Sequence, residues 1–198
     1  MTDNNRQLSV NVKTTGLTRY ILLLSLLLST GLGTSLSYAA TPGDREYQIK
    51  LAFLTNFISY TQWPNHTEKL NQFNFCTSSD RFKELATPHI QSKNSAQRNF
   101  VLLKVKPGEE LQCDLLFVLT EDADIWQPYL AESKPGSILL VGERRGFASS
   151  AGIINFFLAG NKVRFEINLD HLESSGLKIS SRLLRLAKLI RSGENSDD

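Results

Sequence analysis

The sequence predicts an α/β fold in which a mostly parallel sheet is covered by helices on both faces. Short continuous apolar runs recur at residues 100–105, 115–120 and 138–141, a composition typical of strands that are buried on both sides. Segments with helical periodicity lie between these runs, as they do in βαβ units. Nearer the C-terminus, Ala159-Gly160-Asn161 separates two further apolar runs and indicates a tight turn between antiparallel strands.

The first helix is expected to begin at Thr41-Pro42. Thr is a capping residue, Pro is favoured at the first helical position, and an acid, Asp44, follows three residues after the Thr. Apolar residues then recur with helical spacing, and Trp63-Pro64 is expected to end the helix. The other elements expected before the hairpin are strands at residues 73–77, 100–105, 115–120 and 138–141 and helices at residues 80–86 and 122–131.

The last third of the chain is predicted to finish the sheet with an antiparallel hairpin, formed by residues 153–158 and 162–168. Leu169–Ser175 is expected to form a short helical turn, with Gly176 as its C-terminal glycine. Ser180 or Ser181 is then expected to cap a final helix with its basic side chains in water. The residues expected to face inward from that helix are Leu183, Leu184, Leu186, Ala187 and Ile190.

Residues 1–39 have the features of a cleaved secretory signal peptide. A basic segment precedes the apolar run at residues 20–28, and Ser37-Tyr38-Ala39 fits a cleavage site after Ala39. The alternative is an uncleaved membrane anchor, but a span needs about 20 apolar residues, and here polar residues and glycines interrupt the run early. The prediction is a soluble periplasmic protein in which residues 40–192 form one domain and residues 193–198 form a disordered tail.

Charge and cysteine content narrow the function classes. The leader carries three of the 22 basic and one of the 20 acidic residues, so 19 of each remain in the exported part, and this balance gives no indication of nucleic-acid binding. Cys76 and Cys113 are the only cysteines. In an oxidising compartment a disulfide is the favoured state, with two unpaired buried thiols as the alternative.

The usual signatures of enzymes, metal sites and cofactor sites are missing from the sequence. No GxGxxG, GxxxxGK[ST], HExxH or GxSxG motif occurs, and the three histidines are scattered. Ser175 and Lys178 match SxxK, but the glycine between them is expected at a helix end, where the nucleophile signature needs a helix start. The carboxylates of Glu121, Asp122 and Asp124 are best explained by the dipole of the helix that they begin. We therefore expect no catalytic residues, no metal and no cofactor.

One polar row remains to be explained. Arg164, Glu166 and Asn168 alternate with apolar residues and so share one face of the predicted strand. Three interpretations stay open: a solvated face, a structural network that ties the strand to the Ser180/Ser181 helix start, and a binding site for a ligand or partner. In the third, Arg164, Asn168 and the start of that helix would hold a carboxylate or a phosphate.

Several blocks read together resemble the YfiR/HmsC family of periplasmic proteins, and they follow the expected order from about Glu46 to Ala187. The blocks are Glu46-Tyr47, residues 50–57 (KLAFLTNF), Trp63-Pro64, Phe75-Cys76, residues 113–117 (CDLLF), Gly146-Phe147, residues 152–156 (GIINF), residues 164–168 (RFEIN) and residues 176–184 (GLKISSRLL). The resemblance implies a three-layer α/β/α sandwich, a tendency to form homodimers and a regulatory, non-catalytic role. It also implies that Cys76 and Cys113 are the disulfide pair of the family, whereas a second pair that some members have near Gly146-Phe147 is replaced here by Ala148, Ser149 and Ser150.

Proteins of that family repress an inner-membrane diguanylate cyclase by binding its periplasmic portion, and an outer-membrane lipoprotein with an OmpA-like domain can relieve the repression. The resemblance therefore implies control of cyclic di-GMP, and through it of exopolysaccharide and biofilm. The alternative function is a periplasmic small-molecule receptor, for a nucleotide or an amino acid, that feeds a membrane sensor such as a histidine kinase. Arg164, Asn168 and the serine-capped helix are the residues that suggest this alternative.

Overall fold

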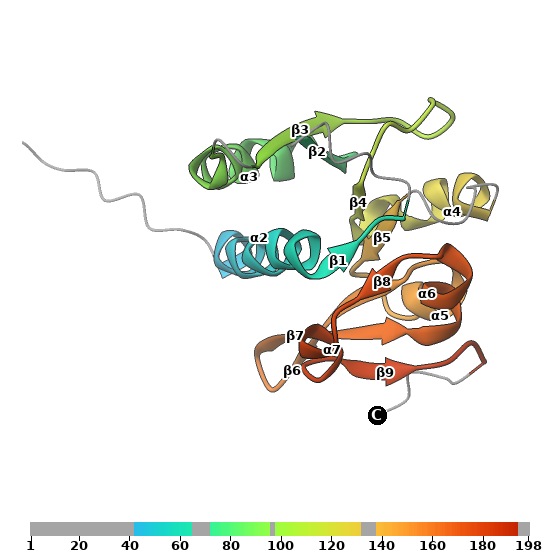
Figure 1. Cartoon of the computed structure of the whole chain (residues 1–198). Coiled ribbons are helices and arrows are strands. Elements are labelled where there is room, and N and C mark those ends of the chain that lie inside the picture. The colour runs from blue at the N-terminus through green and yellow to red at the C-terminus, as the bar shows by residue number, and fades with distance from the viewer. Residues whose placement is uncertain (1–41, 65–71, 96–97, 132–137, 194–198) are drawn as a thin grey trace, which may run out of the picture. The chain divides into compact units, whose positions relative to one another are not determined.

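A computed structural model describes residues 42–64, 72–95, 98–131 and 138–193 (Figure 1). The predicted leader, Thr41 and the end of the predicted tail lie outside these residues. The helices are α2 (Pro42–Tyr60), α3 (Asp80–Lys93), the 3-10 turn η1 (Thr120–Asp122), α4 (Ala123–Ala131), α5 (Phe147–Ser150), α6 (Leu169–Ser175) and α7 (Ser181–Leu184). The strands are β1 (Thr61–Gln62), β2 (Gln72–Thr77), β3 (Asn99–Lys104), β4 (Leu115–Val118), β5 (Leu139–Gly142), β6 (Ile154–Ala159), β7 (Lys162–Asn168), β8 (Lys178–Ile179) and β9 (Lys188–Ile190).

Seven strands form one mixed, mostly parallel sheet in the order β3-β2-β4-β5-β6-β7-β9. All neighbouring strands run parallel except β6 and β7, which form the predicted antiparallel hairpin. Two short strands, β1 and β8, pair separately and antiparallel. Their pairing joins the end of α2 to the chain that follows α6, so the first and last thirds of the domain are held together by backbone hydrogen bonds.

Side chains of the central strands alternate between two apolar clusters, as expected for a sheet buried on both faces. In β4, for example, Leu115 and Phe117 belong to one cluster, whereas Leu116 and Val118 belong to the other. The first cluster contains residues of α2, α3, α6 and α7, and the second contains residues of α4 and α5. The predicted α/β/α sandwich is therefore confirmed.

The structure corrects the end of the predicted fold. Residues 180–191 do not form one helix, because α7 stops at Leu184 and residues 188–190 form β9. This strand pairs parallel with β7, so the hairpin is followed by one further edge strand. Leu186, expected to face the core, is 67% exposed. The free backbone edge of β7 offers hydrogen bonds that an isolated amphipathic helix would leave unmade, and this tertiary pairing outweighs the helical pattern.

Cys76 and Cys113 form the predicted disulfide. Cys76 lies in β2 and Cys113 lies two residues before β4, the strand paired beside β2. Both side chains are buried in the apolar cluster that contains α4. The bond therefore links neighbouring strands inside the core.

A buried aromatic ring closes the packing of α5 on the sheet. Phe147 is 3% exposed, and a Cβ built on Gly142 would lie 2.2 Å from an atom of its ring; at Gly152 the distance would be 2.4 Å. Contacts this short are not found between real atoms, so the ring can occupy this place only because both neighbours are glycines. The Gly-Phe block of the sequence thus has a packing role.

We expect Gly142→Ala to lower the free energy of unfolding by about 1–3 kcal/mol, because the new methyl group overlaps a ring that has no free space to enter. Urea unfolding followed by far-UV circular dichroism measures this. Gly43→Ala is the matched control, since nothing lies within 4 Å of its Cβ position. Adding Phe147→Leu to Gly142→Ala should restore part of the loss. A Gly142→Ala protein as stable as Gly43→Ala would show that the ring is not clamped.

Candidate functional site

The polar row of β7 does share one face of the strand, but its three members differ in exposure. Arg164 is exposed, whereas Glu166 and Asn168 are buried, at 3% and 0% exposed. Phe165 and Ile167, between them, point into the apolar cluster on the opposite face. The interpretation as a solvated face is therefore wrong for Glu166 and Asn168.

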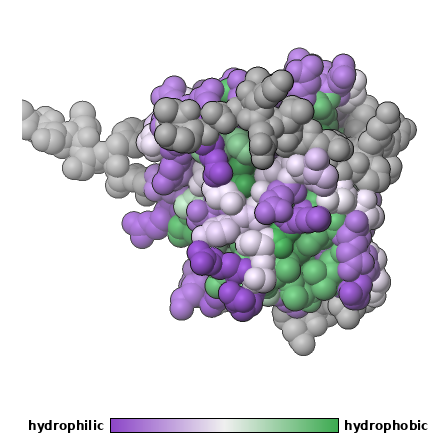
Figure 2. Space-filling model, in the orientation of Figure 1, coloured by the Kyte–Doolittle hydropathy of each residue, from purple (hydrophilic) through white to green (hydrophobic). Residues whose placement is uncertain are grey.

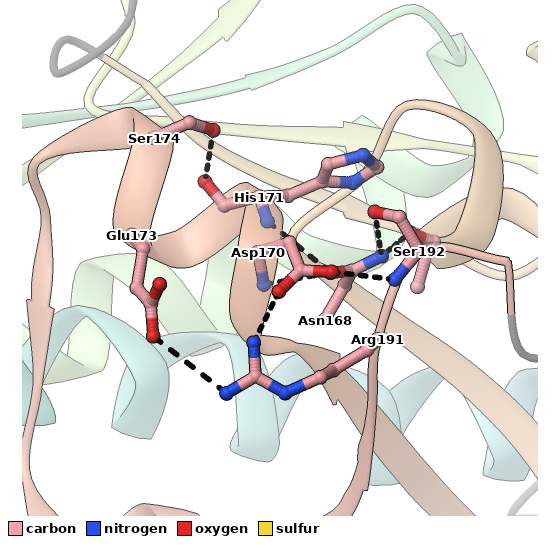
Figure 3. A network of polar contacts seen from close by, with 8 residues as sticks. Asn168, Asp170, His171, Glu173, Ser174, Arg191 and Ser192 are labelled. Carbon is pink, nitrogen blue, oxygen red and sulfur yellow. Dashed lines mark hydrogen bonds and ion pairs between the residues drawn. The ribbon is translucent and has the colours of Figure 1, made fainter.

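Asn168 has a structural role that its hydrogen bonds define (Figure 3). Its Oδ1 accepts hydrogen bonds from the backbone N–H groups of Asp170, at 2.9 Å, and His171, at 3.2 Å, so it caps α6. Its Nδ2 donates to the carbonyl oxygen of Ala148 at 2.8 Å and to Ser192 Oγ at 3.3 Å. One buried amide thus joins β7 to α5, to α6 and to Ser192, two residues after the end of β9.

A second set of contacts fixes the same corner of the molecule. Asp170 accepts a hydrogen bond from the Ser192 N–H at 2.9 Å and pairs with Arg191, which also approaches Glu173 at 3.9 Å (Figure 3). The backbone hydrogen bond from Ser192, and after it the pairing with Arg191, lowers the pKa of Asp170 below its usual range. These contacts hold the end of β9 against the start of α6.

Ser180 and Ser181 lie elsewhere. The Ser180 N–H donates to the carbonyl oxygen of Tyr60 at 2.9 Å, which places this residue beside the end of α2. Its Oγ is buried and makes no hydrogen bond within the described part of the chain, and Ser181 is exposed. The predicted link between the polar row and this helix start is therefore not formed, because the row reaches α5 and α6 in its place.

The SxxK residues also have separate places. Ser175 is buried near the end of α6, where its Oγ donates to the Leu172 carbonyl oxygen at 2.8 Å and accepts from the Leu177 N–H at 3.1 Å. Lys178 is exposed in β8. The Ser175 hydroxyl thus donates and accepts within its own turn. These two hydrogen bonds stabilise the end of α6 at Gly176, whose φ is 72°.

Glu166 lies beside a cavity that the sequence did not predict. Its neighbour across the hairpin is Asn155, which is 1% exposed and donates from Nδ2 to Glu166 Oε1 at 3.3 Å. Both residues line a cavity of about 460 Å³ on the face of β6, β7 and β9 that carries the polar row. The other residues that line it are Glu143, Arg145, Gly146, Phe156, Phe157, Leu158 and Lys188.

Glu143, on the wall of this cavity, is held by a network from α2. Its Oε2 accepts from Lys50 Nζ at 2.7 Å, and its Oε1 accepts from the Thr120 N–H at 3.2 Å and, weakly, from Tyr47 Oη at 3.5 Å. Lys50 also pairs with Glu46 one helical turn earlier. Burial, and after it the charge of Glu143, raises the pKa of the Tyr47 phenol above its usual value, so Tyr47 remains a hydrogen-bond donor.

Sequence reasoning missed Asn155, Glu143 and Lys188. Asn155 could have been noticed, because it is the one polar residue of the apolar run at residues 153–158. Glu143 directly follows a buried strand, at the edge where α/β sheets often bind ligands. Lys188 could not have been placed, because the sequence predicted a helix where β9 forms.

No group of three or more metal-ligating side chains gathers within the described ranges. Two of the carboxylates at the start of α4 are engaged separately: Asp122 accepts from Ser78 Oγ, and Asp124 pairs with Arg144. In the same part of the chain, no helix has the length and apolar character that a membrane span requires.

The chain matches a family model described as YfiR/HmsC-like. The match covers residues 47–188, which is more than half of the chain. It runs from α2 into β9 and includes the hairpin, the disulfide and the residues that line the cavity.

Proposed function

From the premise that this chain belongs to the YfiR/HmsC-like family, we propose that it is a periplasmic regulator that binds and represses an inner-membrane diguanylate cyclase. The observation that carries the proposal is the family match over residues 47–188. Repression lowers cyclic di-GMP, and with it exopolysaccharide and biofilm. An OmpA-like outer-membrane lipoprotein would relieve the repression, and the regulator would act as a homodimer.

Two further features support a role outside the cytoplasm. The first 39 residues have the sequence features of an export signal. The disulfide between Cys76 and Cys113 is of the kind that persists in oxidising compartments and is rare where thiols are kept reduced. Export would bring the protein to the side of the membrane on which the periplasmic portion of the cyclase lies.

An exposed apolar surface near the C-terminus is the place where we propose that the cyclase binds. Leu186 and Leu189 are 67% and 46% exposed, and Leu189 belongs to the edge strand β9. In Figure 2 hydrophobic side chains gather in the region where Figure 1 draws β8, α6 and β9. Exposed apolar groups beside an unpaired strand edge are typical of protein-binding surfaces.

Deleting the gene in a strain that retains its partner cyclase should raise cyclic di-GMP and biofilm several-fold, and the intact gene should reverse both. Leu186→Ser should fold normally but fail to complement. Ile125→Ser is the matched control, because Ile125 is as large as a leucine and is 59% exposed on α4; this variant should complement fully. Cyclic di-GMP is measured by mass spectrometry of cell extracts. Unchanged levels in the deletion strain would contradict repression; complementation by Leu186→Ser would contradict only the binding surface.

A further inference from the structure

The cavity beside Glu166 exists because β6 extends beyond its neighbour in the sheet. β5 pairs with β6 only at Ile154 and Asn155, whereas β6 continues to Ala159. Phe157 and Leu158 therefore pair with β7 on one side and with no strand of the described residues on the other. The space left at the carboxyl end of β5 is the cavity of about 460 Å³, which is large enough for a molecule of amino-acid size.

Two side chains that line this cavity, Asn155 and Glu166, carry hydrogen-bond acceptors that lack adequate donors among the described residues. The Glu166 carboxylate can only accept, so the NH₂ of Asn155 faces it and the carbonyl oxygen of Asn155 points away. That oxygen is buried and has no hydrogen-bond partner within the described ranges. The Glu166 carboxylate accepts one hydrogen bond from the described residues, the 3.3 Å bond from Asn155, although Glu166 is only 3% exposed. Buried acceptors of this kind normally have donors.

The charged groups around the cavity are not all available to a ligand. Glu143 is already bound by Lys50 and Thr120, and Arg145 has an interaction of its own. Lys188, opposite Glu166 in the β7–β9 register, is exposed, and its side chain makes no hydrogen bond or ion pair with any described residue. The groups left to a ligand are therefore two acceptors, one of them an acid, and one cation at the rim.

We propose that this cavity binds a small molecule through a primary ammonium group, which donates to Asn155 Oδ1 and to the Glu166 carboxylate. An ammonium group fits because it supplies three N–H donors and a positive charge at a single atom. Phe157 and Leu158 provide an apolar wall for the rest of the molecule. A ligand that also carries a carboxylate, as an α-amino acid does, would place it toward Lys188; a simple amine would use the inner subsite alone.

Three probes of the same carbon skeleton separate these chemistries in calorimetric titrations of the exported protein purified from the periplasm. L-Leucine has both charged groups, 3-methylbutylamine lacks the carboxylate, and 4-methylpentanoate lacks the ammonium. We expect leucine and the amine to bind and the acid not to bind. If leucine binds more tightly than 3-methylbutylamine, the natural ligand is zwitterionic. If the two bind equally, it is a simple amine. Binding of the acid alone, or of none of the three, would overturn the proposal.

Variants test which residues hold the ammonium. Glu166→Gln should lower the affinity for 3-methylbutylamine about 10- to 100-fold, the loss expected for one charged hydrogen bond. Lys188→Ala should leave the affinity for the amine unchanged. If the ligand is zwitterionic, this variant should lower the affinity for leucine. Lys162→Ala, on an exposed lysine of the same hairpin outside the cavity, should change neither. An amine that binds Glu166→Gln as tightly as the wild type is held somewhere else.

Because Glu166 is buried, its variant can fail to fold, so a second pair of variants keeps the test decisive. Leu158→Lys places a competing ammonium at the cavity wall, on a side chain that is 58% exposed, and should abolish amine binding. Ile125→Lys makes a similar change on an isoleucine that is 59% exposed and outside the cavity, and should not affect amine binding. None of these measurements requires the cyclase, so their failure would leave the proposed repression untouched.

Discussion

Lys50→Met is expected to lower the free energy of unfolding by about 3–5 kcal/mol, one of the largest effects of any single substitution in this protein. The Lys50 and Glu143 side chains are only 7% and 6% exposed, and their charged atoms lie 2.7 Å apart. Removing the lysine leaves the carboxylate of Glu143 buried without its counter-charge, and the cost of such a group exceeds what the pair itself contributes. Urea unfolding at neutral pH measures the loss.

Two comparisons test that explanation. Arg81 pairs with Asp44 at 3.0 Å, but its side chain is 65% exposed, so Arg81→Met should lower the free energy of unfolding far less than Lys50→Met does. Adding Glu143→Leu to Lys50→Met removes the unpaired buried carboxylate and should recover part of the lost stability. A double variant that is less stable than Lys50→Met would mean that the packing of α2, and not the buried charge, explains the loss.

Loss of the disulfide is the other change with a large expected effect. The bond joins residues 37 positions apart, and closing a loop of this length stabilises the folded state by about 4 kcal/mol in the chain-entropy model. Cys76→Ala/Cys113→Ala should therefore unfold at a much lower urea concentration than the wild type. The wild type treated with a reductant under unfolding conditions should show a similar decrease.

The alanine double variant is its own control for this experiment, because it has no thiol and its unfolding midpoint should be the same with and without reductant. A decrease in the variant would show that the reductant acts elsewhere. A wild type whose midpoint does not change on reduction would contradict a stabilising role of the bond, and the buried sulfur atoms would then act only as packing groups.

The elements that the sequence predicted well are those determined by the conformational preferences of residues at the same position in the chain. The hairpin follows from Gly160 and Asn161, which both adopt the positive φ that a tight turn requires. The end of α6 follows from Gly176, which adopts the left-handed conformation at the C-cap. In each case the residue and the conformation that it permits lie at the same position, so no distant contact is needed to make the prediction.

The candidate site was predictable only in part. The period of two placed Arg164, Glu166 and Asn168 on one face of a strand, and the structure confirms this. Their burial was not predictable, because Asn168 is covered by α5 and α6, and Glu166 is paired across the hairpin with Asn155. The period of a strand determines which side chains share a face but not what covers that face.

The sequence by itself determined the fold class, the family and the hairpin, because each depends on residue types and their order along the chain. It favoured the disulfide because the chain has two cysteines and the features of an exported protein. The tertiary structure decided the place of the last segment, where residues 188–190 pair with β7 although their pattern also fits a helix. It also decided that Asn155, Glu166 and Lys188 surround one cavity. Both outcomes depend on the edges that neighbouring strands leave free, and such edges exist only once the sheet has formed.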